Sequence, residues 1–235
     1  MRKRFFILIA VLISVLACVQ AQPLKRSVTV GVFGGLDIPV FNTTFRDYWN
    51  NGSNLGLESQ IHLSDKITLC PRIAYHRFGL NQDRLFDKFG SAVHESGGRI
   101  VFHKGQRSLW ELALQLQFYL SQPEDMVGFY LTLGGSYNAL FYETAEGAFE
   151  KSDQEYFEIL REKVTFQGYG PHAGFGLDYW MASWFSVYSE ARFHFLKTTL
   201  TPFRPVNDHE VEFVFYHDSN KLAYISVLWG AHISL

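Results

Sequence analysis

His232 and Ser234 are residues whose types could support hydrolytic chemistry, and they lie two positions apart near the C-terminal end. A serine and a histidine with a carboxylate partner can cleave esters, but such triads are defined by geometry and not by spacing. No acidic residue follows this pair, and the alternation of the segment turns both side chains away from its apolar face. We therefore expect no catalytic role for them.

Metal and cofactor chemistry has equally little support. The pairs His94–Glu95 and His209–Glu210 could bind a metal ion weakly, but both lie in polar connecting segments where solvation explains them better. The glycines of residues 168–176 alternate along an extended segment and precede no helix, so they are unlike a phosphate-binding loop. The sequence predicts no enzymatic activity, no cofactor and no metal site.

The other groups with chemical potential are charged residues on the polar faces of alternating segments. A buried charge is costly unless an opposite charge pairs with it. We therefore predict that Arg72 and Arg192 bridge to carboxylates. We interpret the network as structural filling and not as a gate or a proton-sensitive switch. Its expected members are Glu58, Arg72, Glu111, Glu190, Arg192 and His194.

The segments that carry these residues alternate apolar and polar side chains with a period of two, which is typical of a β-strand with two different faces. Residues 108–121 show the pattern clearly, because Trp110, Leu112 and Leu114 share one face and Glu111 shares the other with Gln115. The pattern predicts eight strands, at residues 27–37, 54–63, 66–79, 108–121, 127–143, 164–180, 184–196 and 221–235.

The connections between these strands alternate between short and long. Residues 64–65, 122–126 and 181–183 are short, whereas residues 38–53, 80–107, 144–163 and 197–220 are long. Tight turns at one end and long loops at the other are typical of an up-and-down transmembrane barrel. The predicted fold is therefore all-β, an eight-stranded antiparallel up-and-down transmembrane β-barrel.

The phase of the alternation distinguishes two kinds of barrel. A soluble, lipocalin-like carrier would enclose the apolar residues, whereas a membrane barrel would turn them outward. We favour the membrane barrel, because the aromatic-rich apolar face is too large to fit inside an eight-stranded lumen. Aromatic residues also cluster near the two ends of the strands, as interfacial girdles do. The expected girdle residues are Tyr119, Tyr179, Trp184 and Trp229 near the turns, and Trp110, Tyr142, Phe193 and Phe195 near the loops.

Prolines and glycines refine this interpretation. Pro71 and Pro171 fall inside predicted strands, where each removes a hydrogen-bond donor, so we expect a bulge or local fraying at each. Pro39 is expected in a long loop. The glycines of residues 168–176 should leave room inside the barrel for large side chains such as Tyr130 or Tyr188.

The long loops carry local patterns of their own. Residues 43–49 have an N-cap-like start and aromatic content, which favours a short helical turn. Residues 150–163 are charged and rich in helix formers, which predicts a surface helix. Residues 211–216 alternate and would extend the last hairpin.

The N-terminus has the pattern of an export signal. Arg2, Lys3 and Arg4 precede a short apolar run, and small residues follow it, so residues 1–21 are predicted to be a cleaved signal peptide and residues 22–235 the barrel domain. Lipidation at Cys18 is the alternative. Removing the signal leaves 18 basic residues (21 minus 3) against 23 acidic ones, which argues against nucleic-acid binding.

Three stretches, residues 45–56, 109–116 and 170–179, resemble the PorT-like family of outer-membrane barrels. They resemble its first outer loop with the return strand, its strand with an inward glutamate among leucines, and its glycine-rich sixth strand. The resemblance implies an outer-membrane β-barrel without shared catalytic residues, and a link to protein secretion in some members. The terminal Leu235 differs from the phenylalanine that ends many such barrels.

Together these features predict a non-enzymatic integral protein of the Gram-negative outer membrane, a scaffold or interaction protein with long extracellular loops. Its expected partners are outer-membrane lipid, the barrel-insertion machinery, and proteins at the outer loops, with no nucleic acid among them. A membrane-embedded lipid-modifying enzyme and a soluble periplasmic carrier are the alternatives.

Overall fold

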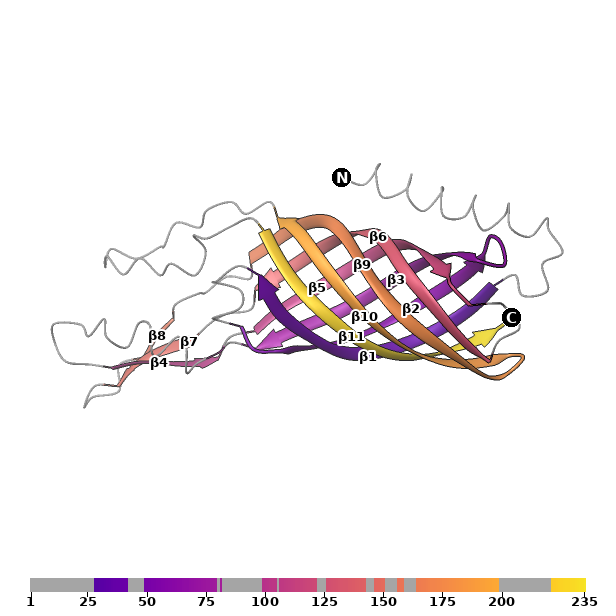
Figure 1. Cartoon of the computed structure of the whole chain (residues 1–235). Helices are drawn as coiled ribbons and strands as arrows, with labels where there is room; N and C mark the ends of the chain where they lie inside the picture. The colour runs from indigo at the N-terminus through magenta and orange to yellow at the C-terminus, as the bar shows by residue number, and fades with distance from the viewer. Residues whose placement is uncertain are drawn as a thin grey trace.

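The fold is that of a computed structural model. The structure describes residues 28–41, 49–79, 81, 99–104, 106–121, 126–142, 146–150, 156–158, 164–198 and 221–235. Eight of its strands form a closed antiparallel barrel in the order β1-β11-β10-β9-β6-β5-β3-β2 (Figure 1). They are β1 (Val28–Phe41), β2 (Gly52–His62), β3 (Ile67–Gly79), β5 (Gln106–Tyr119), β6 (Val127–Tyr142), β9 (Val164–Ala182), β10 (Phe185–Thr198) and β11 (Lys221–Ser234).

Each barrel strand pairs with the next barrel strand along the chain, and β1 pairs with β11 to close the cylinder. The predicted all-β, eight-stranded up-and-down fold is therefore confirmed. We call the end that carries the connections β2–β3, β5–β6 and β9–β10 the turn end, and the opposite end the loop end. The C-terminus lies at the turn end (Figure 1).

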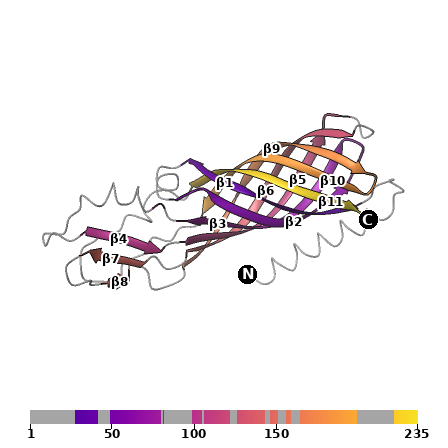
Figure 2. The same ribbon diagram turned by 90° about the horizontal axis from the view of Figure 1, so that it is seen from below.

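A second, smaller sheet is built from the long connections. It has the strand order β4-β7-β8, with β4 at Arg99–Lys104, β7 at Glu146–Glu150 and β8 at Tyr156–Glu158. Figures 1 and 2 show it beyond the loop end of the barrel. The described residues include no helix long and apolar enough to cross a membrane.

The alternation of the barrel strands has the predicted phase. Leu55 on β2 and Phe175 on β9 point outward and are 68% and 64% exposed, whereas the inward Glu111 and Arg192 are 2% and 1% exposed. The apolar residues therefore cover the outside and the ionic residues fill the inside. The inverse arrangement of a soluble carrier is wrong for this chain.

The bulge or fraying predicted at the strand prolines is found only in part. No register shift occurs at Pro71 or Pro171; each keeps its pairing on one side, with Leu114 and Gly135 respectively. On the other side of each proline the paired residues are interrupted, because proline has no N–H to donate. Pro39 lies within β1, not in a loop, and the irregularity of the β1–β11 pairing follows it.

Two further expectations need correction. The surface helix predicted over residues 150–163 is wrong at residues 156–158, which form β8, because pairing with β7 outweighs local helix propensity. Tyr119 points inward and donates a hydrogen bond to Asp178 at 2.5 Å, so it does not contribute to the outer girdle. The expected helical turn over 43–48, the extension over 211–216 and the signal peptide over 1–21 lie outside the described residues.

The inward glycines make room for large side chains, as predicted for Tyr130. A Cβ atom added at Gly176 would collide with the Tyr130 ring, and one added at Gly230 would collide with the Tyr188 ring. The two tyrosines are almost fully buried. Glycines on neighbouring strands therefore set how deeply these rings reach into the lumen.

We predict that Gly176→Ala destabilises the barrel by about 1–3 kcal/mol, because the Tyr130 ring is held by its contact with Glu190 and cannot move aside. The matched control is Gly135→Ala on the outer surface, where the nearest atom would be 3.7 Å from the new Cβ. Urea unfolding in detergent micelles measures both. Equal stability of the two variants would contradict the packing described here.

Candidate functional site: the buried charge network of the lumen

The inward faces of the strands bring charged side chains together in two clusters, one in each half of the barrel. Inward positions follow from the period of the strands, so a charge on one strand faces the lumen beside charges of its neighbours. Glu58 on β2 and Arg72 on β3 are cross-strand partners, and Glu190 and Arg192 lie two apart on β10. These four residues form the centre of the cluster in the turn-end half.

Arg72 joins both walls of the lumen. Its Nη2 atom lies 2.8 Å from Oε2 of Glu58 and donates a hydrogen bond to the hydroxyl of Tyr188 at 3.2 Å. Its Nη1 atom lies 3.9 Å from Oε1 of Glu190, and its guanidinium lies 3.8 Å from the centre of the Phe33 ring. One arginine thus connects β2 with β10 across the interior.

Glu190 is bound from two further directions. Arg192 donates to its Oε1 atom through Nε at 2.6 Å and also through Nη2. Tyr130 on β6 donates to Oε2 at 3.2 Å. Each side chain of this group is at most 3% exposed. Two arginines and two glutamates therefore compensate one another inside the barrel, as a buried set of charges requires.

The same cluster contains a serine, a histidine and carboxylates in a triad-like order. Oγ of Ser186 lies 3.4 Å from Nδ1 of His232, and Nε2 of His232 lies 2.6 Å from Oε1 of Glu58. A working nucleophile must reach a substrate. Ser186 and His232 are both 0% exposed, and the imidazole stacks on Tyr188 at 4.4 Å. These contacts hold the histidine as a structural group.

Asp37 is the anchor of the second cluster, in the loop-end half. Its Oδ2 atom lies 2.8 Å from Nδ1 of His76, and its Oδ1 atom accepts hydrogen bonds from Asn54 at 2.7 Å and Ser226 at 2.5 Å. These partners come from β3, β2 and β11. The carboxylate therefore connects β1 with strands on both of its sides.

Glu111 is the other acid of the loop-end cluster. Its Oε2 atom lies 3.2 Å from Nδ1 of His194, 3.9 Å from Nε2 of His76, and 3.4 Å from the Tyr224 hydroxyl. His194 stacks on Tyr224 with ring centres 4.4 Å apart. Two imidazoles and a tyrosine hydroxyl thus lie around the Glu111 carboxylate.

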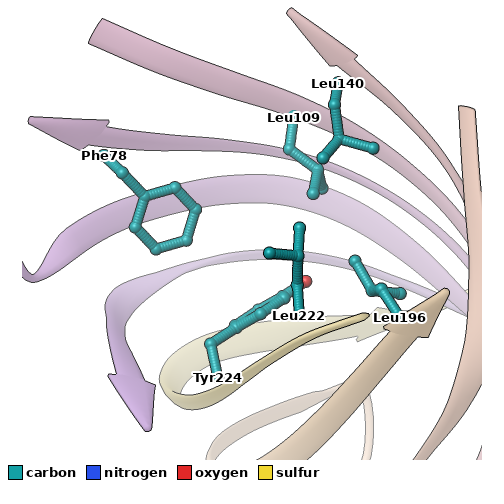
Figure 3. Packing of buried hydrophobic residues seen from close by; sticks show 6 residues of the cluster. All are labelled: Phe78, Leu109, Leu140, Leu196, Leu222 and Tyr224. Atoms are coloured by element: carbon teal, nitrogen blue, oxygen red, sulfur yellow. The ribbon is translucent and has the colours of Figure 1, made fainter. Parts of the chain in front are cut away.

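An apolar layer lies beyond the second cluster, towards the loop end. Its six buried side chains come from β3, β5, β6, β10 and β11 and converge at the loop end (Figure 3). Trp49, which precedes β2, packs against it. We call these residues the apolar layer: Phe78, Leu109, Leu140, Leu196, Leu222 and Tyr224. A mainly apolar group of buried side chains therefore lies on the loop side of the charged clusters.

The structure places all six residues of the expected network in the lumen but divides them. Four lie in the turn-end cluster, and Glu111 and His194 lie in the loop-end cluster. The sequence interpretation missed Asp37, which pairs with His76 as described above. The sequence contained the signal that would have found it. Asp37 continues the alternation of the inward positions 29, 31, 33 and 35 of β1, which places its side chain in the lumen.

The clusters can hold the walls of the barrel together, but their chemistry is limited by burial. Among the residues that the structure describes, no three side chains of His, Cys, Asp or Glu are arranged to bind a metal ion. The acids and bases instead compensate one another. The arrangement is that of a packed polar core, which an eight-stranded barrel is narrow enough to fill with side chains.

No known protein-family profile and no curated protein sequence matches the chain. Solved structures of outer-membrane proteins are similar at low identity. OprG of Pseudomonas aeruginosa is 13% identical with a TM-score of 0.46, over 89% of this chain and 94% of OprG. The N-terminal β-barrel domain of OprF from the same organism is 11% identical with a TM-score of 0.43, over 89% and 98%. The outer-membrane protease OmpT of Escherichia coli is 8% identical with a TM-score of 0.40, over 88% and 96%.

We predict that Arg72→Met destabilises the barrel by about 3–5 kcal/mol, because it leaves the Glu58 and Glu190 carboxylates partly uncompensated in the interior. The matched control is Arg77→Met on the same strand, since Arg77 points outward and is exposed. Unfolding in detergent micelles, followed by the loss of strand signal in circular dichroism, compares the two. A loss for Arg77→Met as large as for Arg72→Met would refute a role specific to the lumen.

Proposed function

We propose that the protein is an integral outer-membrane β-barrel without enzymatic activity, and that it acts as a scaffold or interaction protein through its long loops. The observation that carries the proposal is the opposite character of its two faces. Large apolar residues such as Val32, Leu57 and Leu133 are more than half exposed on the outside, while the inside is polar and buried. Such a surface is unfavourable in water and suits the hydrocarbon of a bilayer.

Closure of the sheet supports insertion into a membrane. In hydrocarbon every backbone amide needs a partner within the protein, and a sheet satisfies this only when it closes on itself. The β1–β11 pairing supplies this closure. Outward aromatic residues near the strand ends, Trp184 and Trp229 near the turns and Trp110 and Phe193 near the loops, suit the two interfaces.

The filled lumen favours a scaffold over a channel or an enzyme. The interior is occupied by the two charge clusters and by the apolar layer. The Ser186–His232–Glu58 arrangement lies inside the barrel, away from lipid and from bulk solvent. The long connections at the loop end are then the part of the molecule that partners can reach.

Export, membrane insertion and family membership complete the proposal. A chain exported through the signal at residues 1–21 would reach the outer membrane from the periplasm. The barrel-insertion machinery would then act on the barrel strands, and outer-membrane lipid would surround the barrel. The inward Glu111 among outward leucines resembles a strand of the PorT-like family, and we propose membership of that family.

Membrane insertion is tested by fractionation and gel mobility. We expect the protein to stay with the outer-membrane fraction, to require detergent for extraction, and to migrate differently on a gel before and after boiling. The barrel resists unfolding in mild detergent, because its backbone hydrogen bonds are closed upon themselves. Release by osmotic shock, with no change of mobility on boiling, would contradict the proposal.

The role of the loops is tested by removing one of them. Gly79 and Gln106 are cross-strand partners, so a two-residue Asn-Gly turn can replace residues 80–105 directly. We expect the shortened protein to keep its heat-dependent mobility but to lose partners that cross-linking on intact cells detects for the full chain. Retention of every cross-linked partner would show that this loop is not the interaction site.

A further inference from the structure

We propose that the middle of the lumen is a binding site for ordered water, formed by Gln115 on β5, Thr132 on β6 and His172 on β9. The three side chains come from neighbouring strands, point inward, and are 1%, 3% and 2% exposed. Within the part of the chain that the structure describes, five of their polar atoms have no hydrogen-bond partner: Oε1 and Nε2 of Gln115, Oγ1 of Thr132, and Nδ1 and Nε2 of His172. Such groups are costly when buried, and bound water is the usual partner where the protein supplies none.

The register brings the three side chains together around two glycines. Gly134 is the cross-strand partner of Gln115 on one side and of His172 on the other. A Cβ atom added at Gly134 would lie 2.7 Å from Cβ of Gln115 and 2.6 Å from Nε2 of His172, so both side chains reach the same point. Thr132 precedes Gly134 by two positions on the same inward face and is the partner of Gly174. It is therefore a diagonal neighbour of Gln115 and of His172.

The lumen beside Gly174 is lined by a small hydroxyl. At the inward Gly176 on the same strand, the Tyr130 ring occupies the position of the missing side chain. At Gly174 the nearest side-chain atom to an added Cβ would instead be Oγ1 of Thr132, at 3.2 Å. A hydroxyl takes up less volume than a phenol ring, so this part of the lumen suits a ligand of the size of water.

The site lies between the two charge clusters. Gly174 is also the cross-strand partner of Arg192, which belongs to the turn-end cluster. His172 is the partner of His194, which belongs to the loop-end cluster, and the centres of the two imidazole rings are 5.5 Å apart. Water bound at this level therefore connects the two clusters into one continuous polar core.

The mixture of donors and acceptors selects water over an ion. The Gln115 amide has an acceptor oxygen and a donor nitrogen, and the Thr132 hydroxyl serves as both. A neutral imidazole such as that of His172 likewise has one donor and one acceptor nitrogen. Water donates and accepts, and a buried molecule makes about three hydrogen bonds, so about two molecules suffice for the five atoms. A cation would leave the donors without partners, and an anion would leave the acceptors without partners.

A crystal structure of the wild-type barrel that resolves ordered solvent tests the site directly. We expect water within about 2.7–3.2 Å of Oγ1 of Thr132 and of the side-chain amide of Gln115, with the imidazole of His172 as a further partner. Direct hydrogen bonds among these three side chains, with no water beside them, would overturn the proposal. This measurement needs no variant, so it decides the question even where a substitution prevents folding.

The sign of one substitution also separates a hydrated site from a dry one. Thr132→Val removes the hydroxyl and keeps the shape of the side chain. In a dry lumen the substitution removes an unpaired polar group and stabilises the barrel, whereas in a hydrated lumen it removes a partner of bound water and destabilises the barrel. We expect the folding equilibrium constant, measured by urea unfolding in detergent micelles, to fall about two- to tenfold. An unchanged or larger constant would refute the water site.

The matched control is Thr29→Val, at another inward position of the lumen. Oγ1 of Thr29 donates directly to Oε1 of Gln60 at 3.0 Å, and Thr29 is 0% exposed. Its substitution lowers the folding equilibrium constant whether the middle of the lumen is hydrated or dry. It therefore measures the effect of losing one buried threonine hydrogen bond, with which the effect of Thr132→Val is compared.

A double variant tests whether Thr132 and Gln115 share the water. Gln115→Met removes both polar atoms of the amide at similar volume. We expect the two substitutions together to lower the folding equilibrium constant by less than the product of their separate effects, because both remove partners of the same bound water. Independent effects, which multiply, would contradict a site shared by the two side chains.

Discussion

Closure of the sheet is the constraint on which the rest of the molecule depends. The antiparallel pairing of β1 with β11 leaves no edge in the barrel, so the backbone is satisfied without help from solvent. Each strand then has one face inside and one outside, and side chains alternate between two environments that differ completely in polarity. The interior of an eight-stranded barrel is just wide enough for side chains to fill, so the charges that point inward have to compensate one another.

The two charge clusters are the consequence of this constraint. Arg72 bridges carboxylates on opposite walls, and Asp37 binds side chains of β2, β3 and β11. Such contacts join strands that are distant in the sequence, and they fix one arrangement of the lumen among those that the backbone would allow. The buried Ser186 and His232 belong to this packing, which explains why a triad-like set of residues occurs where no substrate can enter.

The sequence was sufficient to predict the positions of the strands and which face of each points outward, because alternation with a period of two is a local property of the chain. The residues of β10 fall within two positions of the predicted range 184–196, and the six expected lumen residues all point inward. The partners of each charged residue were harder to predict from the sequence. Arg72 and Glu190 are 118 positions apart, and their proximity depends on the tilt of strands across the barrel, which no local pattern encodes. The failures at Pro39 and at residues 156–158 have the same origin, since pairing with a distant strand overrides the local preference.

The apolar layer at the loop end has a consequence for how the protein can change. It lies on the loop side of the compensated charges, so we expect a new charge introduced in a loop to have little effect on them. Loop length and composition can therefore diverge while the cylinder keeps its internal electrostatics.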